Sequence, residues 1–451
     1  MPVSRRSVLS TALTAAAAAG ALAASSASAA PARPPGRPPR RRDPVDNRFW
    51  SGFAEWHTGT RDGVRVIPGL RPGIAIGRPA GVTPYSDPHT GRTESWEYAT
   101  WTSPAHRPRV PATELIASWN AHTPAGTWLR AEVSGVCSDG TATPWFVLGN
   151  WASGDGDIAR ASVDGQSGGG VSVWTDTLSV DDPASGRRLV SYRIRLTLHR
   201  RPGSRLTPVV HRAGAMASDI PDRFTVPASE PRTARELAVP RYSQNVHIGR
   251  YPEYDSGGEA WCSPTSSEMI LEYWGRRADP AELAWVDPAF DDPQICNAAR
   301  STYDHQYRGC GNWAFNAAYA ASRHRMNAVV TRLSSLTDAE RLVSAGIPVI
   351  TSQSFLAAEL TGAGYGTAGH LMTVIGFTPE GDVIANDPAA AGNAAVRRVY
   401  RRREFEEIWL RTKRYRADGK VSSGTGGVCY LYWPERPAPA QRRVLAALGV
   451  R

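Results

Sequence analysis

The chain has 451 residues, 41% of them apolar, which is enough for two ordinary domains with buried cores. Beyond the N-terminal region no apolar run approaches the about 20 residues that a membrane-spanning helix needs, so we expect no membrane span. The net charge is +10, but seven arginines lie in residues 1–42, and the rest of the chain carries only +3. The sequence also has no nucleic-acid-binding motif, so we expect no nucleic-acid partner.

The N-terminus has the features of an export signal. Arg5 and Arg6 precede a stretch rich in alanine and leucine, and small residues at 27–29 offer a cleavage site. We therefore predict that residues 1–29 are a twin-arginine-type signal peptide and that the protein is secreted. An ordinary signal with two arginines by chance is the alternative. Residues 30–45, rich in proline and arginine, are predicted to be an extended linker.

Residues 46–217 have the pattern of a β domain. Short runs of alternating or β-branched residues recur, and clusters of turn residues separate them. The predicted strands are 114–119, 127–133, 145–148, 171–174 and 192–198. Many strands at short spacing indicate an all-β accessory domain with a sandwich or jelly-roll fold.

Nine of the fifteen tryptophans lie in this β domain, from Trp50 to Trp174. Exposed indoles could stack on sugar rings, which would make the domain a module for cell-wall glycan. The alternative is that they fill the core of the domain and its edges.

A second linker is predicted at 218–235, and the pattern then changes to helices followed by strands. This order indicates an α+β domain over 236–436, with a C-terminal tail at 437–451. The predicted helices are 264–275, 313–323 and one that begins with the capping box at 337–340 and ends at Gly346. The predicted strands are 348–351, 371–377, 383–385 and 428–432.

Cys262 is the candidate nucleophile of the second domain. Pro264 suits the first position of a helix, which places Cys262 just before the helix N-terminus. The positive end of a helix dipole favours a thiolate over a thiol there. A thiolate also needs a base and an oxyanion site, and a structural or disulfide-bonded cysteine is the alternative.

His370 is the candidate base. It stands at the start of the apolar strand 371–377, where a titratable ring is costly unless it has a partner. A turn and a second strand, 383–385, predict a hairpin that brings Asp387 or Asn386 close to His370. Most isolated histidines are surface or satisfied core residues, and an Asp-Pro pair can simply start a turn, but a carboxylate opposite His370 favours the orienting role of a triad.

Gln244 lies upstream of the cysteine and carries an amide that could donate to a developing oxyanion together with the backbone N–H of Cys262. The order Gln244, Cys262, His370, Asp387 resembles the papain-like clan of cysteine peptidases and, more closely, the C39-like peptidase family. The shared motifs are V-P-x-x-x-Q, W-C-x-P-[TA]-S, G-H-x-x-x-V-x-G-F and N-D-P, with further likeness at 311–316, 345–349 and 403–409. The likeness covers about residues 236–436.

This resemblance implies a papain-like fold in which Cys262 attacks a carbonyl carbon, His370 acts as base and then acid, Asp387 orients His370, and Gln244 lines the oxyanion hole. The family usually has a glycine directly after the cysteine, where this chain has Ser263. A side chain there could narrow the site or change which acyl groups fit. Family members fused to membrane transporters cleave leader peptides after paired glycines, and that substrate does not carry over to a chain without a predicted span.

The chain has five cysteines, so at least one thiol is unpaired within it. If that thiol is Cys262, the other four can form two bridges. The short segment between Cys296 and Cys310 favours that pair, and Cys137 with Cys429 would then join the two domains, but sequence alone leaves the connectivity open. Histidines and cysteines lack metal-ligand spacing, so we expect no metal and no cofactor.

The sequence as a whole therefore predicts a secreted two-domain cysteine peptidase that acts on a peptide or protein. The alternative is a non-catalytic protein whose C39-like domain binds peptide or cell wall and has lost turnover.

Overall fold

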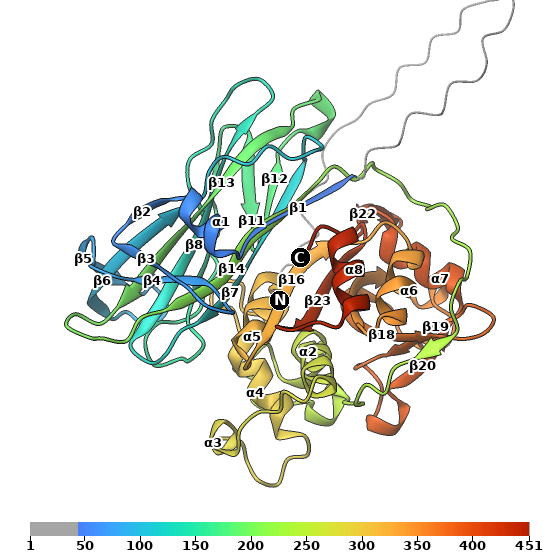
Figure 1. The fold of residues 1–451 in the computed structure, drawn as a ribbon. Helices are drawn as coiled ribbons and strands as arrows, with labels where there is room; N and C mark the ends of the chain where they lie inside the picture. Colours follow the sequence, from blue (N-terminus) through green and yellow to red (C-terminus); the bar gives the residue numbers. More distant parts are fainter. Residues whose placement is uncertain (1–43, 451) are drawn as a thin grey trace, which may run out of the picture.

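A computed structural model describes residues 44–450, which form two β-rich halves (Figure 1). The first half covers about 44–218 and is blue to green in the figure, and the second covers about 236–450 and is yellow-green to red. The predicted signal peptide and all but the last two residues of the predicted linker at 30–45 lie outside the described residues.

The first half consists of two sheets whose described strand pairs are all antiparallel. The first sheet runs β10 (Ser167–Gly168), β11 (Val171–Trp174), β12 (Thr177–Val180), β7 (Glu114–His122), β14 (Val209–Ser218), β4 (Gly73–Ile76), β3 (Val64–Ile67), with β1 (Val45–Trp50) beside β14. The second runs β2 (Thr60–Asp62), β6 (Thr93–Thr102), β13 (Leu189–Arg200), β8 (Thr127–Cys137), β9 (Phe146–Trp151), with β5 (Gly81–Ser86) beside β6. A short helix, α1 (Phe53–Thr58), follows β1.

The tryptophans of this half build its core. Seven of the nine are at most 2% exposed: Trp50, Trp56, Trp96, Trp101, Trp119, Trp128 and Trp151. Trp145 is half-buried with the Arg195 guanidinium 4.2 Å above its ring, and Trp174 is exposed. The core interpretation of the tryptophans is thus confirmed for seven of them, and the structure gives no support to a sugar-binding platform built from these indoles.

The second half has one larger antiparallel sheet with helices around it. The sheet runs β16 (Met326–Arg332), β23 (Val428–Pro434), β17 (Val349–Phe355), β18 (Thr367–Phe377), β19 (Val383–Asn386), β20 (Arg397–Tyr400), with β15 (Arg235–Glu236) beside β18. The helices are α2 (Cys262–Tyr273), α3 (Pro280–Leu283), α4 (Pro293–Thr302), α5 (Trp313–Ser322), α6 (Leu336–Ser344), α7 (Arg402–Leu410) and α8 (Pro439–Ala447). A separate hairpin joins β21 (Lys413–Tyr415) to β22 (Val421–Ser423).

The elements that carry the candidate site agree with the sequence patterns. The predicted helix 264–275 corresponds to α2, and the predicted strands 371–377 and 383–385 correspond to β18 and β19. Because α2 packs against β18, the helix that begins with Cys262 lies next to the strand that carries His370.

The segment predicted as a C-terminal tail contains α8. Pro439 stands in the first turn of this helix, and the Gln441 side chain accepts a hydrogen bond from the Ala438 N–H at 2.8 Å. Leu445 and Val450 are buried, so this end of the chain is packed into the second half.

The two halves share one hydrophobic cluster. Phe315 of α5 lies against the rings of Trp119 and Trp151, with centroid distances of 6.2 and 5.3 Å. The amide of Asn120 makes two hydrogen bonds with the backbone of Ala328, at 2.7 and 3.2 Å. These contacts join β7 of the first half to α5 and β16 of the second.

All five cysteines are free thiols, and the expected bridges Cys296–Cys310 and Cys137–Cys429 do not form. The Cys296 sulfur lies 3.5 Å from Nδ1 of His247, whereas the Cys310 thiol donates to the Ala299 carbonyl at 3.4 Å. Cys137 and Cys429 belong to different hydrophobic clusters. Cys296 and Cys310 share one hydrophobic cluster, but each sulfur is directed at a polar partner of its own and not at the other sulfur.

Candidate active site

Cys262 is the first residue of α2, two residues earlier than Pro264 suggested. The Thr265 N–H donates to the Trp261 carbonyl at 3.0 Å, which closes the first turn. The first N–H groups of a helix have no partner within it, so the backbone around Cys262 presents donors where negative charge develops. Cys262 is partly exposed, in contrast to the other four cysteines, which are buried.

Three hydroxyls fix the start of α2 against the sheet. Ser263 hydrogen-bonds with the Tyr430 hydroxyl at 2.9 Å, and Ser267 with the Tyr432 hydroxyl at 3.0 Å. Ser266 donates to the Leu371 carbonyl, next to His370, at 3.4 Å. Ser263 is fully buried, so its side chain does not narrow the site. Its hydrogen bond to Tyr430 anchors the start of α2 to strand β23.

His370 lies on β18 between Cys262 and Asp387. Its Nε2 donates to Oδ1 of Asp387 at 2.9 Å, and the Cys262 thiol lies close enough to the ring to help raise the pKa of His370. Since Nε2 is committed to the carboxylate, Nδ1 is the nitrogen left for the sulfur. The structure therefore brings together three of the four residues that the sequence singled out.

Asp387, and not Asn386, is the partner of His370. The Asn386 amide donates to the backbone carbonyl of Pro240 at 2.9 Å, on the other side of the strand. This outcome settles the choice that the sequence left open, because successive residues of a strand point to opposite faces.

Two tyrosines that sequence reasoning missed also hold Asp387. The Tyr400 hydroxyl donates to Oδ2 at 2.7 Å, and the Tyr365 hydroxyl donates to Oδ2 at 2.9 Å. The Ala389 N–H donates to Oδ1 at 3.0 Å. Burial and the charge of Asp387 raise the pKa of both tyrosines, so both remain protonated donors. No motif pointed to them, since Tyr365 lies in a glycine-rich loop and Tyr400 on a strand of ordinary pattern.

The His370–Asp387 pair is charged in spite of its burial. Burial alone would lower the pKa of His370, but the negative charge and hydrogen bond of Asp387, with the nearby Cys262 sulfur, raise it to about 10. Burial alone would raise the pKa of Asp387, but the charge and hydrogen bond of His370 and the Tyr400 hydroxyl lower it to about 2. The arrangement thus supports an imidazolium beside the Cys262 sulfur at neutral pH.

Gln244 is buried and lies against the turn Gly258–Ala260, which leads into α2. Its Nε2 donates to the Glu259 carbonyl at 2.6 Å, three residues before Cys262. The amide nitrogen has two hydrogens, so one remains for a further acceptor. The backbone N–H of Gln244 donates to the Pro388 carbonyl at 2.9 Å, which ties this residue to the segment after Asp387.

Within residues 44–450, no group of three or more His, Cys, Asp and Glu side chains is arranged to hold a metal ion. None of the described helices is long and apolar enough to cross a membrane.

Comparisons with known families cover both halves of the chain. A family described as Peptidase C39 N-terminal domain matches residues 46–218, and one described as Peptidase_C39 like family matches residues 236–417. Together the two matches span most of the described chain. A comparison with curated proteins found no match.

Solved structures give two weaker similarities. A crystal structure from Bacillus anthracis, described as a C39-like peptidase, is 18% identical and covers 46% of this chain and 100% of its own, with a TM-score of 0.29. The enzymatically active domain of tailspike protein 4 from bacteriophage CBA120 is 13% identical and covers 37% of this chain and 20% of its own, with a TM-score of 0.19.

Proposed function

Because this chain is a C39-like family protein, we propose that it is a cysteine peptidase of papain-like mechanism, with Cys262 as nucleophile. One observation carries the proposal: the Cys262 thiol at the start of α2 lies beside His370, and His370 is hydrogen-bonded to Asp387, just beyond the next strand. A nucleophile, a base and a group that orients the base are the parts that covalent acyl transfer needs.

In the first step the Cys262 thiolate attacks the carbonyl carbon of the substrate, and the carbonyl electron pair moves onto its oxygen. The free hydrogen of the Gln244 amide and the Cys262 backbone N–H stabilise this oxyanion. The His370 imidazolium then gives its proton to the leaving amine, the C–N bond breaks, and a thioester with Cys262 remains.

In the second step His370, now neutral, takes a proton from water, and the hydroxide attacks the thioester. The tetrahedral adduct collapses as the C–S bond breaks, which releases the acid product and the Cys262 thiolate. The proton that His370 took from water stays on its ring and restores the thiolate–imidazolium pair. Asp387 stays ionised throughout and keeps Nε2 of His370 protonated, so that Nδ1 faces the reacting atoms.

The proposal is tested by incubating the mature protein with a peptide library in ¹⁸O-labelled water and identifying the products by mass spectrometry. We expect new C-termini that carry ¹⁸O, and none from Cys262→Ala. Cys137→Ala, which removes a buried thiol in the other half, is the matched control and should cleave as the wild type does. Cleavage by Cys262→Ala would exclude this mechanism.

We also propose that the protein is secreted through its twin-arginine-type signal at residues 1–29. The proposal rests on Arg5 and Arg6 before an apolar stretch. We expect the double change of both to Lys to abolish secretion, whereas the same change at Arg40 and Arg41, in the linker, should not. Undiminished secretion of the first variant would contradict the twin-arginine route.

A further inference from the structure

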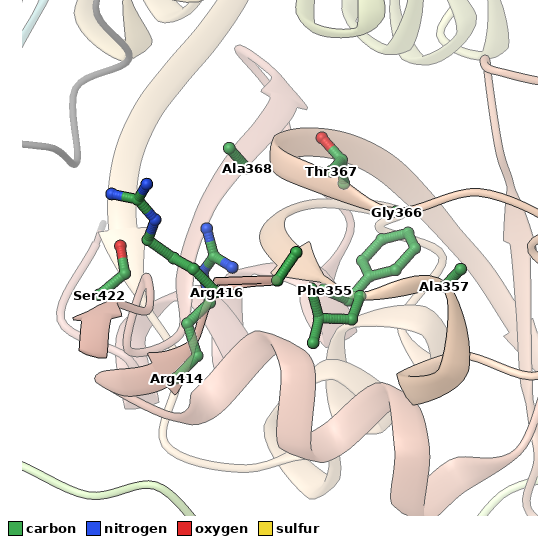
Figure 2. Close-up of a pocket in the computed structure, with 10 residues that line it drawn as sticks. Phe355, Ala357, Gly366, Thr367, Ala368, Arg414, Arg416 and Ser422 are labelled. Atoms are coloured by element: carbon green, nitrogen blue, oxygen red, sulfur yellow. The ribbon is translucent and has the colours of Figure 1, made fainter. Parts of the chain in front are cut away.

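A cavity of about 510 Å³ lies beside the candidate active site, at the start of β18. Its lining comes from three places: the end of β17 with the residues after it, the segment before His370, and the β21–β22 hairpin. The residues that matter here are Phe355, Leu356, Ala357, Ala368, Arg414 and Arg416. Figure 2 shows Arg414 and Arg416 on one side of the cavity and Phe355 and Ala357 on the other.

Arg414 is a buried cation whose charge has no carboxylate partner among the described residues. It is 4% exposed, its Nε has no hydrogen-bond partner within residues 44–450, and its NH1 donates only a long bond of 3.4 Å to the Tyr415 carbonyl. Arg411, by contrast, is held by both carboxylate oxygens of Glu359 at 2.6 and 2.8 Å. A buried guanidinium without an anion is costly.

The other charges near Arg414 do not supply that anion. Burial and the positive charges of Arg411 and Arg416 lower the pKa of Arg414, and only Glu359, which is already paired with Arg411, opposes them. Arg416 pairs with Asp418 at 2.9 Å on the exposed side of the hairpin. The wall of the cavity therefore carries an excess of positive charge.

The cavity is close enough to the site to receive part of a substrate. The Phe355 ring, which lines it, lies 5.3 Å from the ring of Tyr365, and Tyr365 lies 5.6 Å from the ring of His370. Ala368, which also lines the cavity, lies two residues before His370 on β18, about 7 Å along an extended strand. A peptide that lies along β18 at His370 would therefore reach the cavity within about three residues.

We propose that this cavity is a specificity subsite that binds a carboxylate of the peptide substrate, close to the bond that is cut. The proposal rests on the peptidase function proposed above and adds to it the chemical class that the enzyme selects. Arg414 and Arg416 would hold the carboxylate through charge-assisted hydrogen bonds, and Leu356 and Ala357, which are at least partly exposed, would cover its methylene groups. The carboxylate could belong to an acidic side chain or to the C-terminus of the peptide.

Binding is measured first, because it does not need turnover. The mature chain with Cys262→Ala is titrated with three probes: acetyl-Gly-Glu-amide, acetyl-Gly-Gln-amide and acetyl-Gly-Gln with a free C-terminus. We expect a carboxylate probe to bind about tenfold more tightly than the neutral amide, the usual value of a hydrogen-bonded charge. Preference for the Glu probe assigns the site to side chains, and preference for the free acid assigns it to chain ends.

Three variants test which residues provide the preference. Arg416→Gln changes an exposed residue and should fold normally, whereas Arg414→Lys keeps a charge at the buried position if Arg414→Gln fails to fold. We expect Arg414→Gln to remove the preference, and Arg416→Gln to reduce it. Arg341→Gln, on the exposed face of α6, is the matched control and should keep it. Equal binding of all three probes by the Cys262→Ala chain would overturn the subsite.

Cleavage of the peptide library separates this proposal from the peptidase proposal. We expect Asp or Glu, or a free C-terminus, to be enriched at one position within about three residues of the cut, and the enrichment to be lost in Arg414→Gln. A binding preference without any cleavage would retain the subsite and exclude the peptidase. Cleavage without acidic enrichment, together with equal binding, would retain the peptidase and exclude the subsite.

Discussion

His370 and Asp387 meet across two neighbouring antiparallel strands, with 2.9 Å between Nε2 and Oδ1. The register of β18 and β19 pairs Thr373 with Asn386, so Asp387 lies just beyond the last ladder pair, where its side chain can turn toward His370. Tyr400, on the third strand, fixes the other carboxylate oxygen. Three adjacent strands thus determine the geometry of the base, while α2 supplies the thiol.

The first prediction concerns the reactivity of Cys262. Because the pKa of His370 is raised to about 10, its ring is an imidazolium at neutral pH and stabilises a thiolate beside it. We expect iodoacetamide to label Cys262 readily between about pH 6 and about pH 8, and His370→Ala to slow the labelling at the lower pH by about tenfold or more. Peptide mass spectrometry of the native protein gives the rates. A Cys262 that stays unreactive across this range would exclude an activated pair.

The second prediction concerns stability against pH. The raised pKa of His370 adds stability that is fully present below its unfolded value of 6.5 and is lost as pH rises through about 10. The lowered pKa of Asp387 adds stability that is present above its unfolded value of 3.8 and is lost as pH falls through about 2. The pair therefore contributes most between these two unfolded values.

We expect the free energy of unfolding in urea to fall between about pH 6.5 and pH 9.5 by roughly 2–4 kcal/mol because of this pair. In His370→Gln that part of the fall should disappear, since the residue no longer titrates. The same slope in both proteins would show that other groups cause it.

The third prediction concerns the orienting carboxylate. Asp387→Asn removes the charge that raises the pKa of His370 and changes what Nε2 can bond to, so we expect kcat on any cleaved peptide to fall by about 10²–10⁴. The pH profile should shift as well, with the imidazolium lost at lower pH than in the wild type. Asp382→Asn, in the turn between β18 and β19, is the matched control and should keep both kcat and profile. An unchanged profile in Asp387→Asn would contradict the role of this residue.

The strands that carry the candidate pair were predictable because each is a short apolar run bounded by turn residues. The choice between Asn386 and Asp387 was not. It depends on which face of the strand each residue takes, and an irregularity between Val374 and Gly376 shifts the register just before His370 is reached. A shift of one residue exchanges the two faces of a strand, and composition does not reveal it.

Other features of the site depend on contacts between distant segments. The hydrogen bonds of Tyr365 and Tyr400 to Asp387 depend on how the loop before β18 and the strand β20 pack around that carboxylate. Arg414 lies in the basic segment 411–416, whose sequence gives no sign of burial. Its burial is set by the hairpin that folds against the end of β17 and the start of β18. Sequence spacing does not contain these relationships.

The fourth prediction concerns the thiols. Since all five cysteines are free and only Cys262 is partly exposed, we expect brief alkylation of the native protein to modify Cys262 alone. After denaturation without a reductant, all five should be modified. Burial raises the pKa of Cys296 to about 12 and also raises that of Cys310, which further slows their reaction in the folded state. Mass spectrometry of the intact, non-reduced protein checks the count, and a mass lower by two hydrogens per bridge would contradict it.

The last prediction concerns the union of the two halves. Phe315 is fully buried between Trp119 and Trp151, so α5 of the second half completes the core of the first. Because one hydrophobic cluster spans both halves, we expect the described part of the chain to unfold in a single cooperative transition.

Phe315→Ala should destabilise the protein by about 3–5 kcal/mol, through lost burial and the cavity left behind. Leu70→Ala, at a side chain that is 83% exposed, should change stability by under about 0.5 kcal/mol. Tryptophan fluorescence and calorimetry measured together decide the matter, because nine of the fifteen tryptophans lie in the first half and the heat comes from both. Coincident transitions that Phe315→Ala shifts together mean that the halves depend on each other, whereas two separate transitions in the wild type would mean that the first half folds independently.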